Sequence, residues 1–260
     1  MRDSRLADRK LQVRVGNQTI EESNNEKLLG ITMSNNMTWH SLLYGNKLTG
    51  SEKEIGLLKQ LSQRIGMLKQ LNKYMSKAQH KTTCDGIFTS KLLYCLPLFC
   101  NVWGIRNMDD TNRRFTALTK EDMPKLQVLQ NHVLRLKTGN FELNVPTTKL
   151  LEDNKELSVQ QLGALHTVLN VFKIITSGEP RYLAEKLILR KAVNGQIFPL
   201  RSINTIQVHS DRTLVRSGFA YRGAQLWNQL PALMRQETKL AVFKTQLREW
   251  ITANVPAKPP

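Results

Sequence analysis

The stretch SVQQLGALHTVLNVFKIITSGEP, residues 158–180, has the pattern of an amphipathic helix. Ser158 is a favourable N-cap, and Gln161 stands at the third helical position, which is the capping-box arrangement. The stripe with three- and four-residue spacing consists of Leu162, Leu165, Leu169 and Phe172. Apolar residues at that spacing share one helix face. Gly178, followed shortly by a proline, predicts the end of the helix.

Further helices are predicted on both sides of this stretch. Ser76 and Gln79 repeat the capping box, and the helix that they begin is expected to reach about Cys95 and stop before Pro97. The period is helical from Lys53 onward. The remaining predicted stripes are Leu58, Leu61, Ile65 and Leu68; Leu126, Leu129, Val133 and Leu136, ending at Gly139; and Leu240, Phe243, Leu247 and Trp250.

Strand patterns occur near the N-terminus. LQVRVGNQTIEE, residues 11–22, predicts a hairpin with its turn at Gly16 and Asn17. KLLGITMSNNMTW, residues 27–39, predicts a second strand-like run that is broken at residues 34–36. The expected fold class is therefore mainly α (α+β): a small N-terminal β-hairpin element, a helical bundle, and a helical C-terminal domain with a short irregular or β segment around 190–216.

The charge balance favours a polyanionic partner. The 260 residues include 38 Lys and Arg against 21 Asp and Glu, a formal net charge of +17. Eight of the basic residues lie between Lys47 and Lys81, where the acidic residues are Glu52 and Glu54. Cations on the outer faces of such a helix can follow a phosphate backbone. The alternative is a solvated basic surface that serves only solubility.

Membrane and secreted classes are not favoured. The first ten residues contain no apolar signal region, and the apolar run at 92–100 is too short to cross a bilayer. The three cysteines, Cys84, Cys95 and Cys100, form no metal-binding pair and are expected to be reduced and buried. We expect an intracellular protein, in the cytoplasm or the nucleus, with no membrane partner.

No catalytic constellation is apparent. The pair Asp109–Asp110, within NMDD, would suit a two-metal polymerase turn only between two apolar strands, and its flanks WGIR and TNRRF are not strands. We interpret it as part of a solvated linker. The histidines are scattered, at His40, His80, His132, His166 and His209. We expect no catalytic residues, no metal site and no cofactor.

The segment SGFAYRGAQLWNQLP, residues 217–231, combines aromatic and polar residues. The spacing of Leu226, Trp227 and Leu230 predicts a short helix with a buried tryptophan. Arg216 and Arg222, with Tyr221, could still face nucleic acid, where such side chains stack on unpaired bases.

Several segments resemble, in order, the C-terminal half of non-LTR (LINE-type) retrotransposon reverse transcriptases. They are KLLGITMSNNMTW (27–39), SQRIGMLKQLNKYM (62–75), IFTSKLLYCLPLFCNVWG (87–104), LQVLQNHVLRLKTG (126–139), and FAYRGAQLWNQLP (219–231) followed by FKTQLREWI (243–251). The ordered set is more specific than any single piece, and it covers nearly the whole chain.

The resemblance implies a division of the chain. Residues 1–46 would hold the end of the palm, 47–107 the thumb-like helices, 108–124 a linker and 125–260 the helical C-terminal domain. The primer-grip-like residues would be Leu28, Leu29, Gly30 and Ile31. The core signature would be Trp103, Tyr221, Trp227 and Trp250. The nucleic-acid contacts would be Lys53, Lys59, Arg64, Lys69, Lys73, Lys77, Arg216 and Arg222.

The resemblance also implies a partial enzyme. The catalytic carboxylates of the family precede the segment that LLGI matches, and NMDD follows it, so we expect no polymerase chemistry from this chain itself. The expected function is to bind RNA or an RNA–DNA primer–template duplex, together with the fingers and palm. Three alternatives remain: a stand-alone basic nucleic-acid-binding protein derived from a retroelement, a helical protein-interaction module, and a non-functional remnant.

Overall fold

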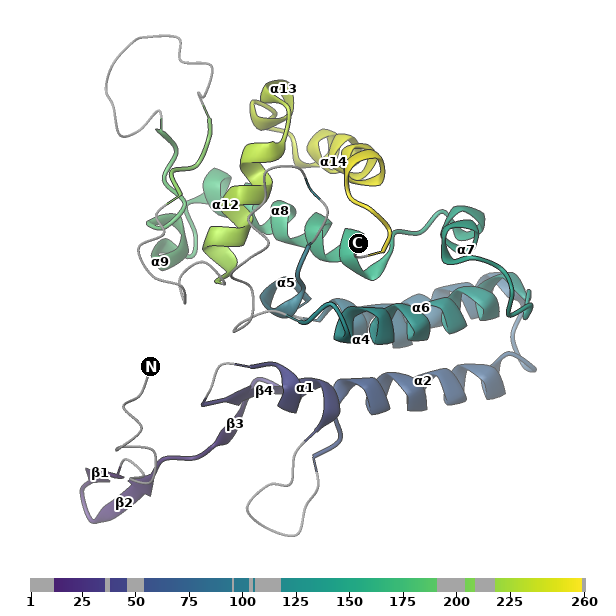
Figure 1. Cartoon of the computed structure of the whole chain (residues 1–260), viewed down its shortest axis with the longest axis horizontal. Helices are drawn as coiled ribbons and strands as arrows, with labels where there is room; N and C mark the ends of the chain where they lie inside the picture. The colour runs from purple at the N-terminus through teal and green to yellow at the C-terminus, as the bar shows by residue number, and fades with distance from the viewer. Residues whose placement is uncertain are drawn as a thin grey trace. The chain divides into compact units, whose positions relative to one another are not determined.

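The computed structural model of the protein describes residues 12–35, 38–45, 54–94, 96–102, 105, 118–190, 204–208 and 218–258. The chain forms two compact units, Met1–Gly56 and Leu57–Pro260. The named strands belong to the first unit and nearly all of the helices to the second (Figure 1). The expected class, mainly α with a small N-terminal β element, is confirmed.

The first unit contains two antiparallel strand pairs. The strands are β1 (Gln12–Val15), β2 (Gln18–Glu21), β3 (Asn25–Leu28) and β4 (Ile31–Ser34). The predicted turn between β1 and β2 is present, and Gly16 has φ 59° there. Residues of β1 and β2 are exposed throughout. The side chains that β4 and the short helix α1 (His40–Tyr44) bury include Ile31 and Leu43.

The predicted strand-like run from residue 27 was wrong in one respect. A two-residue turn at Leu29 and Gly30 splits it into β3 and β4, and the register pairs Leu28 with Ile31. Both turn residues have positive φ, 50° at Leu29 and 79° at Gly30. Such a turn matches the twist of the strands. The predicted break after Ser34 is confirmed, because β4 ends there.

The second unit begins with a helical hairpin. Its segments are α2 (Leu57–Leu71), α3 (Lys77–Cys84), a π-helical turn η2 (Asp85–Thr89) and α4 (Ser90–Leu93). The predicted capping box is present: the Ser76 N–H donates to Gln79 Oε1 at 3.0 Å, and the Gln79 N–H donates to Ser76 Oγ at 3.4 Å. The π-helical turn follows α3 directly, so one helical run extends from Lys77 to Leu93.

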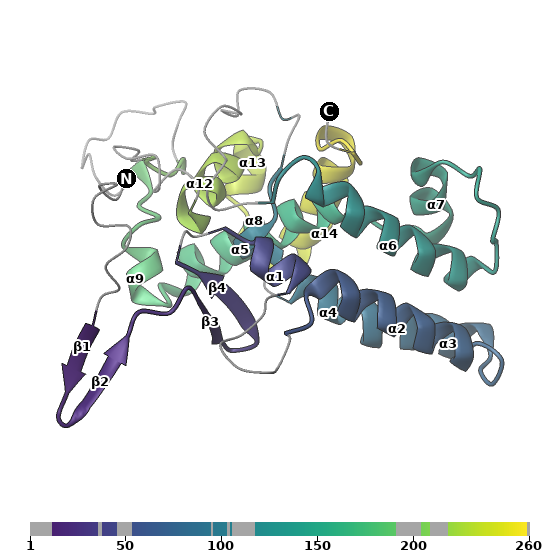
Figure 2. The ribbon, with the colours of Figure 1, turned by 60° about the horizontal axis from the view of Figure 1, so that its bottom comes forward.

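The longest helix, α8 (Val159–Ser177), is the centre of the second unit. All four residues of its predicted stripe are buried, and the predicted capping box and C-terminal Gly178 are both present. The other elements are α5 (Leu96–Phe99), α6 (Asp122–Thr138), α7 (Thr147–Asn154), α9 (Arg181–Ala184), α12 (Phe219–Gln229), α13 (Ala232–Arg235) and α14 (Leu240–Asn254). Of these, α5, α6, α9, α12 and α14 contact α8 (Figures 1 and 2).

The second unit includes helices from both sides of the predicted linker. The thumb-like helices α2 and α3 pack against α6, which begins at Asp122, inside the 108–124 segment. Residues 106–117 lie outside the described residues, as do most of 190–216. From the latter segment, Ile206 forms an isolated antiparallel bridge with Leu189. The functional division drawn from the resemblance stays a prediction.

Two helical glycines should respond in opposite ways to alanine. A Cβ at Gly66, in α2, would meet nothing within 4 Å, whereas a Cβ at Gly163, in α8, would clash with Cys100 Sγ. We expect Gly66→Ala to raise the free energy of unfolding by about 1 kcal/mol. Gly163→Ala should lower it by roughly 1–3 kcal/mol through overpacking. Urea unfolding measures both, and a stable Gly163→Ala protein would contradict the close packing of α5 on α8.

Candidate nucleic-acid interface

The α2–α3 hairpin carries positive charge without compensating carboxylates. Residues 55–84 contain six Lys and Arg residues and no Asp or Glu. The six are Lys59, Arg64, Lys69, Lys73, Lys77 and Lys81. None of the ion pairs found within the described part of the chain involves any of them. A phosphate backbone that approaches the hairpin therefore meets no like charge from this stretch.

Helix α2 separates its apolar and cationic faces. The side chains that it buries are Leu57, Leu61, Ile65 and Leu68. Leu57 takes the buried position that the sequence had predicted for Leu58, which is half-buried. Lys59 and Lys69 are exposed. At 100° per residue, Lys59 lies on the side of the helix opposite the buried stripe, and Lys69 lies at the edge of that stripe. The apolar face fixes the helix to the unit and leaves these lysines toward solvent.

Arg64 differs from the exposed lysines of the hairpin. It is half-buried, and its Nη1 donates a hydrogen bond of 2.5 Å to the Ile87 carbonyl in the π-helical turn. The guanidinium thus joins α2 to η2. The predicted contact between Arg64 and nucleic acid stays a prediction, but its side chain already has a structural role.

The turn between α2 and α3 is also basic and exposed. Lys73 lies in the turn, Lys77 begins α3, and Lys81 follows one helical turn later; all three are exposed. Tyr74, beside Lys73, has 85% of its surface accessible to solvent. The sequence pattern predicted the lysines but did not single out this tyrosine, although its position between two lysines was a usable signal.

Helix α6 adds further positive charge next to α2. Burial lowers the pKa of the His132 imidazole, and the charges of Arg135 and Lys69 lower it further. Lys69 lies on α2 and the other two residues on α6, so the packing of these helices brings the three together. Arg135 also donates to the carbonyls of Glu142 and Leu143, at 3.2 and 3.4 Å. The sequence gave no signal for this cluster, because its members are 63 or more residues apart between the helices.

The predicted contact between Arg222 and nucleic acid requires a correction. Arg222 is buried, with 6% of its surface exposed. Its guanidinium donates to the Pro97, Leu98 and Cys100 carbonyls around α5, at 3.2 Å and 2.6 Å for the first two. A cation that donates to three backbone carbonyls and is covered by protein cannot reach a phosphate. Arg222 is therefore a structural residue that joins α12 to α5.

Some of the other predicted site residues lie outside the described part of the chain, and the primer-grip-like residues lie in the first unit. Lys53, Trp103 and Arg216 lie outside the described residues, as do Asp109 and Asp110. In the first unit, Leu28 and Leu29 are exposed at the tip of the β3–β4 hairpin, Gly30 completes the turn and Ile31 is buried. Their primer-grip-like role stays a prediction.

The predicted core role of Trp227 is confirmed. Its side chain is buried, its Nε1 donates to the Asn204 carbonyl at 2.8 Å, and its ring lies 5.8 Å from that of Phe243. Tyr221 and Trp250 are half-buried. Tyr221 Oη accepts a hydrogen bond of 3.1 Å from Gln225. The aromatic segment is thus chiefly a packing element.

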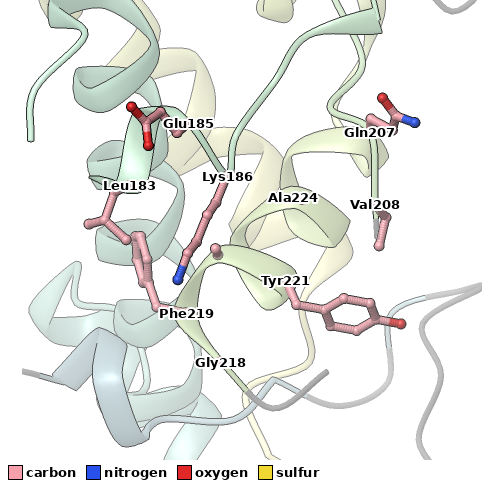
Figure 3. A pocket seen from close by; sticks show the side chains of 10 residues that line it. Leu183, Glu185, Lys186, Gln207, Val208, Gly218, Phe219, Tyr221 and Ala224 are labelled. Carbon is pink, nitrogen blue, oxygen red and sulfur yellow. The ribbon is translucent and has the colours of Figure 1, made fainter. Parts of the chain in front are cut away.

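A pocket of about 550 Å³ lies beside α9 and α12. Leu183, Phe219 and Ala224 contribute apolar surface, while Lys186 and Glu185 provide charge (Figure 3). In Figure 3 the ring of Phe219 stands next to Leu183, and Tyr221 extends to the other side of α12. The polar lining residues, Glu185, Lys186, Gln207 and Tyr221, form no nucleophile–base pair, so the pocket suggests no specific chemistry.

The cysteines Cys84 and Cys100 are free and buried, as predicted. Burial raises the pKa of Cys84 to about 11 and that of Cys100 to about 12, so both are thiols at neutral pH. Among the described residues, no group of three or more His, Cys, Asp or Glu side chains is placed to hold a metal ion. No helix in the described ranges is long and apolar enough to cross a membrane.

No protein-family model, curated protein or solved structure shows a significant match to this chain.

The His132 cluster leads to a prediction about proton binding. Lys69→Gln removes one of the charges that oppose protonation, so the pKa of His132 should rise partway toward the ordinary value of about 6.5. An NMR titration of the imidazole resonances measures this change. The matched control is Lys173→Gln, because Lys173 and Lys244 similarly lower the pKa of the half-buried His166. Lys69→Gln should change only the pKa of His132, and Lys173→Gln only the pKa of His166.

The sign of the effect on stability follows from the same shifts. A lowered folded-state pKa means that the unfolded chain binds protons more readily, so the free energy of unfolding falls as pH drops through about 6.5. Lys69→Gln should weaken this dependence. An unchanged His132 titration in that variant would contradict the proximity of Lys69 to α6.

Proposed function

We propose that this chain binds RNA or RNA–DNA duplex without sequence preference, through the exposed cationic face of the α2–α3 hairpin. The observation that carries the proposal is the exposure of Lys59, Lys69, Lys73, Lys77 and Lys81 within a stretch that has no carboxylate. Contacts of this kind read phosphates and not base edges. The proposal therefore predicts affinity that depends on salt and hardly on sequence.

The length of the face suits a nucleic-acid backbone. Lys59 and Lys69 are ten residues apart on α2, which corresponds to about 15 Å along the helix axis. A duplex presents one negative charge for about every 1.7 Å of its axis. A duplex lying along α2 and the adjoining turn would thus have several phosphates within reach of flexible lysine side chains.

The family resemblance supports the same assignment. Residues 47–107 resemble the thumb of LINE-type reverse transcriptases, the part that holds the primer–template duplex, and the α2–α3 hairpin lies within this range. We therefore propose the thumb and C-terminal portion of such an enzyme as the chain's origin. A retroelement-derived binding protein would use the same surface, whereas a protein-interaction module would not depend on it.

Replacing four lysines tests the surface. Lys59, Lys69, Lys73 and Lys77 changed together to Gln should reduce the slope of log affinity against log salt by roughly three to four units, because each phosphate contact accounts for about one. Arg64 is left intact, since its hydrogen bond to Ile87 serves the fold. Fluorescence anisotropy with a labelled RNA–DNA duplex over a range of salt concentrations gives the slope.

The control has the same change in charge at other sites. Lys173, Lys186, Lys239 and Lys244 are all exposed and lie on α8, on α14 or in the segments that follow α9 and precede α14. Changing these four to Gln should leave most of the salt slope in place.

Equal losses of salt slope in both variants would indicate diffuse electrostatic attraction and not a defined surface. If the wild-type protein binds no nucleic acid, the proposal fails, and the remaining alternatives are the protein-interaction module and the non-functional remnant.

The proposal assigns binding, and not polymerisation, to this chain. With Mg²⁺, a primer–template and deoxynucleotides, the protein should protect the duplex from nuclease but produce no extended primer. Gel analysis of the labelled primer measures extension. Template-dependent extension of the primer would contradict the proposal. If the Asp109→Asn variant also lost that extension, NMDD would be a catalytic turn.

A further inference from the structure

Tyr74 has the largest exposed fraction among the large hydrophobic side chains that the structure describes. Its exposure of 85% would not by itself indicate a site, because single exposed apolar residues are common on soluble proteins. Its surroundings are less ordinary. Lys73 precedes it, Lys77 follows three residues later, and no Asp or Glu occurs from residue 55 to residue 84.

The turn that carries this tyrosine is held in place by hydrogen bonds. The Tyr74 N–H donates to the Leu71 carbonyl at 3.0 Å, and the Asn72 N–H donates to the Leu68 carbonyl at 3.1 Å. The Ser76–Gln79 capping box fixes the start of α3 directly afterwards. The backbone of the turn is thus ordered although the ring extends into solvent. An aromatic ring on a fixed support loses little conformational freedom when it stacks on a ligand.

Positive charge extends from the turn onto the neighbouring helix. Lys69 lies in the last turn of α2, and it and Arg135 both lower the pKa of His132. A second highly exposed tyrosine near a cation, Tyr182, has a different setting. It lies on α9 next to the Arg181–Glu185 ion pair of 3.0 Å, where a carboxylate offsets the cation. Tyr182, with 64% exposure, is therefore a matched control.

We propose that Tyr74 is a stacking platform for an unpaired base, with Lys69, Lys73 and Lys77 binding the phosphates on either side of it. Aromatic side chains interleaved with cations bind single strands in this way, because every base has a face that can stack. The bases inside a regular duplex are already stacked on each other. The tip of the hairpin would thus select single-stranded nucleic acid, or the frayed end of a duplex, while α2 contacts phosphates of either form.

This inference rests on the proposed nucleic-acid binding and narrows it. Tyr74→Ala should weaken binding of a single-stranded oligonucleotide by roughly 5- to 150-fold and leave binding of a blunt duplex unchanged. Tyr74→Phe should bind as the wild type does, because the ring is kept. Tyr182→Ala should also bind as the wild type does. Anisotropy titrations of all four proteins at one salt concentration provide the comparison.

A second measurement reports on stacking directly. A single strand that contains 2-aminopurine should change its fluorescence on binding wild-type protein or Tyr74→Phe, and change it much less on binding Tyr74→Ala at saturation. Because the side chain is exposed, circular dichroism should show the same helix content in every variant. This check separates loss of stacking from loss of folding.

The outcomes separate this inference from the function on which it rests. If Tyr74→Ala binds single strands as tightly as wild type while the four-lysine variant loses affinity, the stacking platform is wrong and the cationic surface stands. Equal weakening of single-strand and blunt-duplex binding would also overturn the stacking role. If the wild-type protein binds neither form, the proposed function fails, and the platform fails with it.

Discussion

The second unit depends on the need to cover α8 on nearly every side. Thirteen of its nineteen residues are buried, so one helix with an apolar surface all round must be enclosed by others. α5, α6, α12 and α14 provide this cover. Two glycines permit the closest approaches: a Cβ at Gly163 would meet Cys100, and a Cβ at Gly223 on α12 would lie 2.6 Å from Val171 Cγ2. Burial of apolar surface is the main stabilising contribution here.

Arg222 extends this arrangement to α5. The residue next to it, Gly223, lets α12 approach α8 closely. The guanidinium of Arg222 donates hydrogen bonds to three backbone carbonyls around α5. Burying a charged group costs free energy, and these hydrogen bonds offset part of that cost. In the segment YRGAQLWNQLP, Arg222, Gly223 and Trp227 thus each make a packing contact that brings distant segments together.

The sequence predicted best what depends on neighbouring residues. The capping boxes at Ser76 and Ser158 and the helix ends at Gly139 and Gly178 are local, and they are confirmed. The turn at Leu29 was missed because LLGI is a continuous apolar run, in which a leucine with positive φ gives no signal.

The exposure of the candidate interface residues was harder to predict from the sequence. Whether an arginine is exposed depends on segments far away: Arg222 contacts carbonyls 122–125 residues earlier, and Arg64 contacts one 23 residues later. The predicted lysines on the hairpin are exposed because helical periodicity alone determines which face of α2 is apolar. The cluster of Lys69 with His132 arises from the packing of α2 on α6, for which the sequence alone provides no register.

The count of 38 Lys and Arg residues therefore overstates the positive charge that is available to a partner. Lys137, whose side chain is only 2% exposed, lies between Asp85 and Glu156 at 2.5 and 2.7 Å. These hydrogen bonds and charges raise its pKa although burial acts in the opposite direction. One ammonium between two carboxylates leaves a local excess of negative charge. Lys137 therefore adds no net positive charge at the end of α6, and the positive charge that acts on His132 comes from Arg135 on α6 and Lys69 on α2.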